Sequence, residues 1–110
     1  MTETDAWAWL VAREPDMPEA LRARMHEVLE TVEERATDIA LRFGLAATLC
    51  LQRALALGDE RAAALDLLAA DAFLTHGAEA AAEYGNNALN IFASSFGADA
   101  LDRLVGGEAT

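Results

Sequence analysis

Lysine is absent from this sequence, and cysteine, proline and aromatic residues are few. The 110 residues include one cysteine and two prolines, and the eight bases are all arginines against 19 acids, for a net charge of −11. A single cysteine excludes an internal disulfide. Because Cys50 lies on an apolar stripe, we expect it to act as a small core residue. A charge this negative repels phosphate backbones and anionic lipids, so neither nucleic acid nor membrane is an expected partner.

The sequence also shows no pattern of known catalytic mechanism. There is no glycine-rich phosphate loop, since Gly106 and Gly107 are close to the C-terminus, and Ser94 and Ser95 lie near no histidine in the sequence. Di-iron bundle proteins use Glu-x-x-His pairs, and none occurs here. The sequence therefore assigns no catalytic residue, no cofactor and no cofactor-binding residue, and an enzyme is the less favoured interpretation.

Targeting and membrane signals are equally weak. The sequence begins Met-Thr-Glu-Thr-Asp, which is acidic where a signal peptide would be basic. The most apolar span, 39–57, contains Arg42, Gln52 and Arg53, which a membrane-spanning helix would tolerate poorly. We therefore expect a cytoplasmic protein in which this span belongs to a soluble core.

The residues that are abundant favour helices. The chain has 26 alanines and 16 leucines but only four valines and two isoleucines, and alanine and leucine are strong helix formers. At this length one hydrophobic core is sufficient. The composition predicts a single all-α domain over residues 1–110.

The central prediction is one long helix over about 17–57. Asp16 and Glu19 resemble a capping box around Pro18, and Gly58 suits a helix end. Between these signals an apolar stripe repeats every 11 residues, as in a nearly straight helix. The stripe is Leu21, Met25, Val28, Val32, Ala36, Ile39, Phe43, Ala47, Cys50 and Ala54. Gly44 interrupts it, which indicates a bend or a close contact between helices.

Shorter helices are predicted on either side of the long one. A helix over 3–14 carries Trp7, Leu10 and Val11 on one face, so we expect Trp7 to anchor it, with Trp9 along its edge. Another helix runs over 59–84 with Gly85 as its cap, and Asn86-Asn87 opens a further helix that bends or ends at Phe96-Gly97. The expected fold is an antiparallel bundle of four helices with a short extra helical turn at 99–105.

Helix lengths predict a second copy of the chain. A helix over 17–57 would span about 60 Å, whereas the next helix would cover only about 37 Å at the same rise per residue. A two-fold homodimer would cover the part of the long helix that the next helix leaves exposed.

Two histidine–glutamate pairs are the available candidates for a metal site. His76 and Glu79 are three residues apart, and His26 and Glu30 are four apart, so each pair shares a helix face. A metal ion needs at least three converging ligands, so no metal site is assigned, and His76 and Glu79 are named only as weak candidates for one. The alternative is an exposed His26 and a His76 that is hydrogen-bonded in the core or lies at a dimer contact.

The sequence favours a non-enzymatic interaction or structural module, a homodimer that presents an apolar helix face to a protein partner. The apolar excess, the single-sign charge and the missing catalytic set support this prediction. The alternative is a helical bundle that binds a small ligand or a metal, with His76, Glu79, Tyr84 and Trp7 near its pocket.

Overall fold

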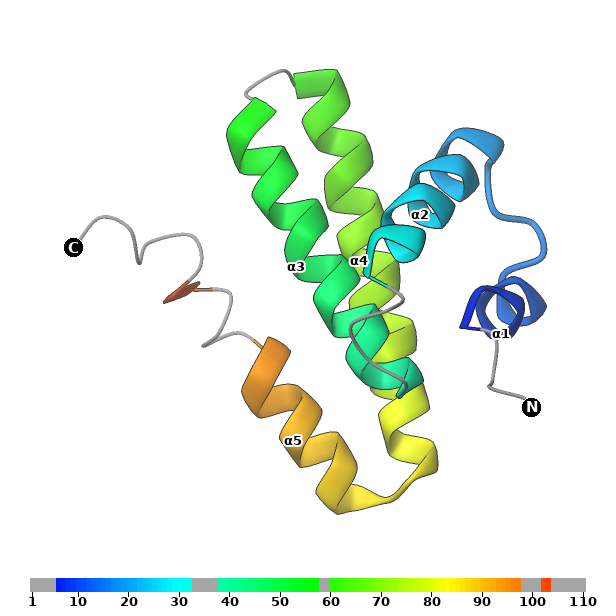
Figure 1. Cartoon of the computed structure of the whole chain (residues 1–110), viewed down its shortest axis with the longest axis vertical. Coiled ribbons are helices and arrows are strands. Elements are labelled where there is room, and N and C mark those ends of the chain that lie inside the picture. Colours follow the sequence, from blue (N-terminus) through cyan, green and yellow to red (C-terminus); the bar gives the residue numbers. More distant parts are fainter. Residues whose placement is uncertain (1–5, 33–37, 58–59, 98–101, 104–110) are drawn as a thin grey trace.

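Helices packed against one another make up the computed structural model of the chain, which describes residues 6–32, 38–57, 60–97 and 102–103 (Figure 1). The helices are α1 (Ala6–Arg13), α2 (Glu19–Val32), α3 (Ile39–Leu57), α4 (Glu60–Glu83) and α5 (Asn86–Phe96). The described part contains no strand, so the all-α prediction is confirmed. Its five helices replace the predicted four.

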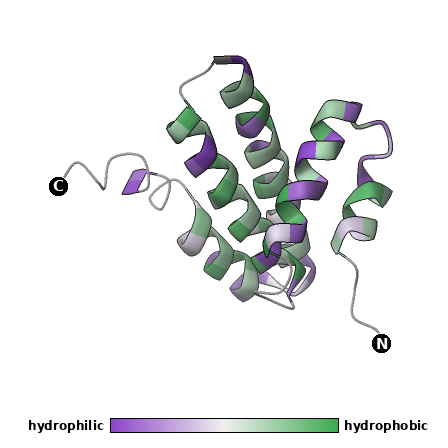
Figure 2. Ribbon diagram, turned by 45° about the horizontal axis from the view of Figure 1, so that its top comes forward, coloured by the Kyte–Doolittle hydropathy of each residue, from purple (hydrophilic) through white to green (hydrophobic). Residues whose placement is uncertain are grey.

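The core lies around an antiparallel pair formed by α3 and α4 (Figure 1). Phe43 of α3 and Phe73 of α4 are both fully buried, and their ring centres lie 5.6 Å apart. Both helices are hydrophobic along most of their length, whereas hydrophilic residues are prominent on α2 (Figure 2). A helix that is apolar around most of its circumference needs more than one neighbour, and α3 has α4, α2 and α5.

The single long helix predicted over about 17–57 is wrong. α2 begins at Glu19 and ends at Val32, α3 begins at Ile39, and α2 lies across the α3–α4 pair instead of extending α3 (Figure 1). Residues 33–37, where the prediction ran on without interruption, lie outside the described residues. The uncovered length that a second copy was expected to cover therefore does not exist.

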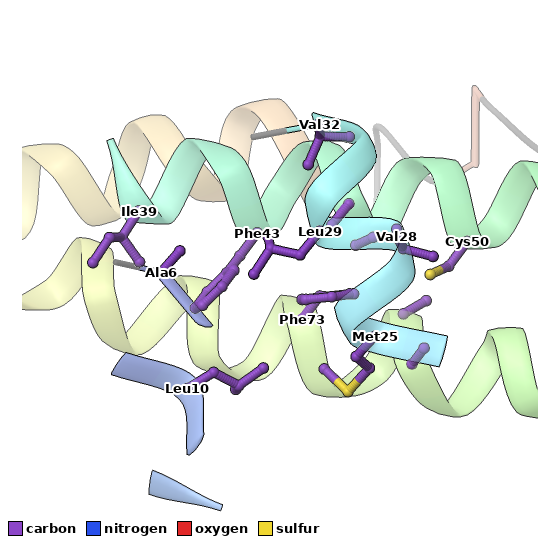
Figure 3. Packing of buried hydrophobic residues seen from close by; sticks show 14 of the residues in the cluster. Ala6, Leu10, Met25, Val28, Leu29, Val32, Ile39, Phe43, Cys50 and Phe73 are labelled. Atoms are coloured by element: carbon purple, nitrogen blue, oxygen red, sulfur yellow. The ribbon is translucent and has the colours of Figure 1, made fainter. Parts of the chain in front are cut away.

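Burial of the α2 stripe explains why the chain folds back. Met25, Val28, Leu29 and Val32 are at most 5% exposed and point into the core beside Phe73 (Figure 3). In a continuous straight helix these four side chains would lie beyond the reach of α4. Burying each one contributes about 1.5–3 kcal/mol, or about 6–12 kcal/mol for the four together, against a net gain of about 0.5–1.5 kcal/mol for one helical hydrogen bond.

Boundaries marked by glycine are close to those predicted. α4 ends at Glu83, and Gly85 has a φ of +115°, which suits a residue without Cβ. α5 begins directly at Asn86, with Gly85 rather than an asparagine at its cap, and ends before Gly97. Most of the predicted turn at 99–105 lies outside the described residues. The described part of this turn, residues 102–103, is helical.

α5 is held against the central pair at two glycines. A Cβ at Gly77 of α4 would come within 2.6 Å of Phe92 Cζ, and a Cβ at Gly44 of α3 would overlap the ring of Phe96. The two phenylalanine rings are themselves 5.1 Å apart. Gly44 therefore marks a close contact between helices, one of the two roles predicted for it.

By length and composition alone, α3 could cross a membrane. It has 19 residues, and an 18-residue window within it has a mean hydropathy of 1.3 and is 44% buried within the fold. Core helices of soluble proteins have the same properties, so this is weak evidence for a membrane span.

Candidate functional site

A polar cluster centred on His76 joins α1 to α4. The His76 side chain is 7% exposed, its Nδ1 lies 2.8 Å from Glu79 Oε1, and its Nε2 lies 3.0 Å from Glu14 Oε2. A carboxylate only accepts hydrogen bonds, so both contacts can be hydrogen bonds to carboxylates only when both ring nitrogens carry a proton. The arrangement therefore places the His76 ring between two glutamate side chains, one at each ring nitrogen.

Arg13 extends this cluster along α4. Its Nη2 lies 2.6 Å from Glu83 Oε2, and its Nε lies 3.9 Å from Glu79 Oε1. The guanidinium carbon lies 3.7 Å from the centre of the Trp9 ring, which is a cation–π geometry. These contacts fasten the short helix α1 to the much longer α4.

Trp7 and Trp9 are both half-buried and both pack against the core. For Trp9, the aromatic contacts are with Phe43 and His76. Its ring centre lies 5.6 Å from that of Phe43 and 6.4 Å from that of His76, whereas Trp7 lies edge-on to His26 at 4.8 Å. Trp7 packs against the core as the prediction required, but the fully buried stripe of α1 consists of Ala6 and Leu10. Trp9 lies beside that stripe.

The structure brings the predicted pair His76 and Glu79 together, but as a hydrogen bond. Glu79 and Glu14 face opposite ring nitrogens, so the three side chains do not converge on a common point for one ion. Nor does any group of three His, Cys, Asp or Glu side chains in the described part of the chain have the arrangement of a metal site. The second pair is also formed, with His26 Nε2 3.7 Å from Glu30 Oε2 and the His26 side chain 46% exposed.

Sequence reasoning missed a buried ion pair between α2 and α4. Arg24 Nη1 donates a hydrogen bond to Asp66 Oδ1 at 2.5 Å, and this bond raises the pKa of Arg24. Asp66 is fully buried, and its Oδ2 has no hydrogen-bond partner among the described residues. Helical spacing could have placed Asp66 on the buried face of α4, since residues 66, 69, 73, 76 and 80 are three or four apart and are all buried.

Cys50 of α3 lies in the core, as predicted. Burial raises the pKa of its thiol to about 12, and the nearby carboxylate of Asp66 acts in the same direction. A nucleophilic cysteine needs the thiolate form and access to solvent. This cysteine has neither, so it is a structural residue.

An apolar groove lies between the start of α3, the end of α4 and α5. It encloses about 180 Å³, and the walls include the buried or half-buried rings of Phe92 and Phe96. Around it, large side chains are left exposed, at 39% for Leu41, 73% for Tyr84 and 58% for Ile91. Sequence reasoning named Tyr84 as a pocket residue but not the groove that it lines.

A second hollow of about 310 Å³ lies between α2 and α3. Its walls are Thr31, Val32, Leu45, Thr48, Leu49 and Gln52. Thr31 donates to the carbonyl of Glu27 and Thr48 to that of Gly44, each within its own helix. With both hydroxyl protons engaged, the hollow offers mainly apolar contacts.

Comparison of the chain with protein-family models, with curated proteins and with solved structures found no match. Its function must therefore be argued from the geometry of these clusters and hollows.

Proposed function

We propose that this protein is a non-enzymatic helical interaction module that forms a homodimer through an apolar helix face. The observation that carries this proposal is the groove between α3, α4 and α5, around which Leu41, Tyr84 and Ile91 expose large apolar surfaces. Contiguous apolar patches of this kind on a soluble domain typically mark sites of association.

The polar clusters support a structural role in preference to catalysis. His76 is engaged through both ring nitrogens, and Arg13 and Arg24 are each engaged with carboxylates. A catalytic acid, base or nucleophile must reach a substrate atom, whereas these groups already bond one another between helices. The buried thiol of Cys50 is equally unsuited to attack.

Mass in solution over a concentration series tests the proposal. Light scattering from about 1 μM to about 1 mM covers dissociation constants typical of weak and moderate complexes. The average mass should rise from 11.7 kDa towards twice that value. A mass of 11.7 kDa at every concentration would overturn the homodimer.

The hollow between α2 and α3 favours a second candidate, a bundle that binds a small apolar ligand. At about 310 Å³ it is at the lower end of the range of ligand pockets. Native mass spectrometry of the purified protein distinguishes the two candidates. A co-purified organic molecule at one per chain, lost on Leu45→Trp substitution, would support ligand binding, whereas the bare mass of the chain would count against it.

A further inference from the structure

We infer that the two copies of the proposed dimer meet at the groove between α3, α4 and α5, with the exposed side chains of each copy covering the groove of the other. This inference rests on the proposed function and adds the surface and the partner, which is a second copy of this chain. The shape and the charge of the surface each favour this interface, and the extent of the surface sets the expected affinity.

The shape of this surface suits two-fold pairing. In a two-fold dimer the same patch meets itself, so it must contain both a projection and a hollow. Here Tyr84 and Ile91 project beside a hollow of about 180 Å³. Such a hollow has room for about six water molecules, which one large apolar side chain from the other copy would displace.

Charge also favours this surface over the acidic faces of the molecule. Two copies that each carry −11 repel one another, so the contact must avoid the acidic faces. The face formed by α1 and α4 carries Glu14, Glu79 and Glu83, and α2 exposes Glu27 and Glu30.

The groove, by contrast, has balanced charge at its α3 edge. Asp38 is the one acid among its described walls, and Arg42 follows it by one helical turn, beside Leu41. Two copies that meet here therefore bring few like charges together, which limits the repulsion that their net charge causes.

The extent of the surface indicates a weak dimer. The 11 residues of α5 span about 16 Å, which is shorter than the roughly 28 Å edge of a square interface of standard area, about 800 Å² per partner. We therefore expect dissociation in the micromolar range or above, so that the concentration series passes through the transition.

Charged substitutions at matched leucine and isoleucine positions test the location of the interface. Ile91 in the groove is 58% exposed. Leu68 of α4 is 57% exposed. It lies 16 residues before Tyr84, which places it about 24 Å from Tyr84 along the direction of the helix. Ile91→Glu should weaken dimerisation at least tenfold, and Leu68→Glu should leave it within twofold of the unsubstituted chain. Tyr84→Glu, at a 73% exposed position, should act like Ile91→Glu, which guards against a folding defect in one variant.

The outcomes separate this inference from the proposed function. If the chain dimerises but Ile91→Glu and Tyr84→Glu leave the dissociation constant unchanged while circular dichroism shows both folded, the groove is not the interface and the homodimer stands. If Leu68→Glu dissociates the dimer, the groove assignment is likewise overturned. If the unsubstituted chain is monomeric throughout, both the homodimer and the groove interface are overturned.

Discussion

Replacing Gly77 with alanine tests how α5 is held against α4. A Cβ at this position would lie 2.6 Å from Phe92 Cζ, 2.8 Å from Phe92 Cε1 and 3.2 Å from Phe43 Cβ. Ordinary carbon contacts begin at about 3.4 Å, so the Phe92 ring must move by about 0.8 Å or more. Phe92 is 8% exposed and lies against the ring of Phe96, so moving its ring towards the groove that it lines disturbs this contact.

Two opposing effects set the magnitude. Alanine favours a helix over glycine by about 1 kcal/mol, whereas overpacking a core costs about 1–3 kcal/mol. Since the clash involves two aromatic residues of the core, we expect overpacking to exceed the propensity gain. Gly77→Ala should then destabilise the fold by up to about 2 kcal/mol, lowering the melting temperature by up to about 8 °C.

Urea unfolding followed by circular dichroism measures this change, with two control variants. Ala64→Gly at an exposed position of the same helix measures the local helix-propensity difference, expected to be about 1 kcal/mol. In a Phe92→Leu background the clash is relieved, so adding Gly77→Ala should stabilise the fold. If Gly77→Ala in the unsubstituted chain raises stability by the full propensity difference, the close contact between Gly77 and Phe92 is wrong.

Four further predictions concern the polar clusters and Cys50. Arg24→Ala should destabilise the fold more than Asp66→Ala in urea unfolding, by about 1 kcal/mol or more, because Asp66 is fully buried whereas the Arg24 side chain is 21% exposed and can reach water. Cys50 in the native protein should react with a thiol reagent at pH 8 at least 100-fold more slowly than in urea. Burial raises the pKa of the Cys50 thiol from 9.0 to about 12. The contribution of Cys50 to the free energy of unfolding is therefore full below pH 9 and declines as the pH rises towards 12. A Cys50→Ala variant should lack this decline. His76→Ala should red-shift tryptophan emission, since both tryptophans lie on α1; an unchanged spectrum would show that His76 does not hold that helix.

The sequence predicted helix content and several helix ends because those depend on local chemistry. Alanine and leucine favour helices wherever they lie, and Gly85 sits at a positive φ that other residues avoid. Pro15 and Pro18 lie between the first two helices, which end at Arg13 and begin at Glu19, and proline disfavours a continuous helix there. None of these signals depends on what the helix packs against.

The break between α2 and α3 could not be predicted in the same way. Residues 33–37 contain neither proline nor glycine, and the 11-residue repeat of apolar residues continues through them. The repeat is compatible with one long helix and with two helices that share a core, because both bury the same stripe. What decides between them is the tertiary burial of side chains such as Met25 and Val28, which no local pattern reports.

The polar clusters escaped prediction for a related reason. Glu14 is 62 residues from His76, and Arg24 is 42 residues from Asp66. Spacing along one helix can identify the pair of His76 and Glu79, and it can place Asp66 on a buried face. It cannot supply a partner from another helix, and the partner determines that His76 ties two helices together rather than offering a free ligand.

The fold and the proposed interface depend on the same contacts. Phe92 and Phe96 rest on the two glycines with one side of their rings and form the wall of the groove with the other. A displacement of α5 would therefore alter the groove as well as the core. In the proposed dimer, Gly77→Ala should weaken association even though residue 77 is buried and far from any partner atom, whereas Ala64→Gly should lower stability without changing the dissociation constant. Conversely, since a second copy would bind only the chain with α5 in place, dimerisation should raise the melting temperature as protein concentration increases, and this dependence should disappear in Ile91→Glu.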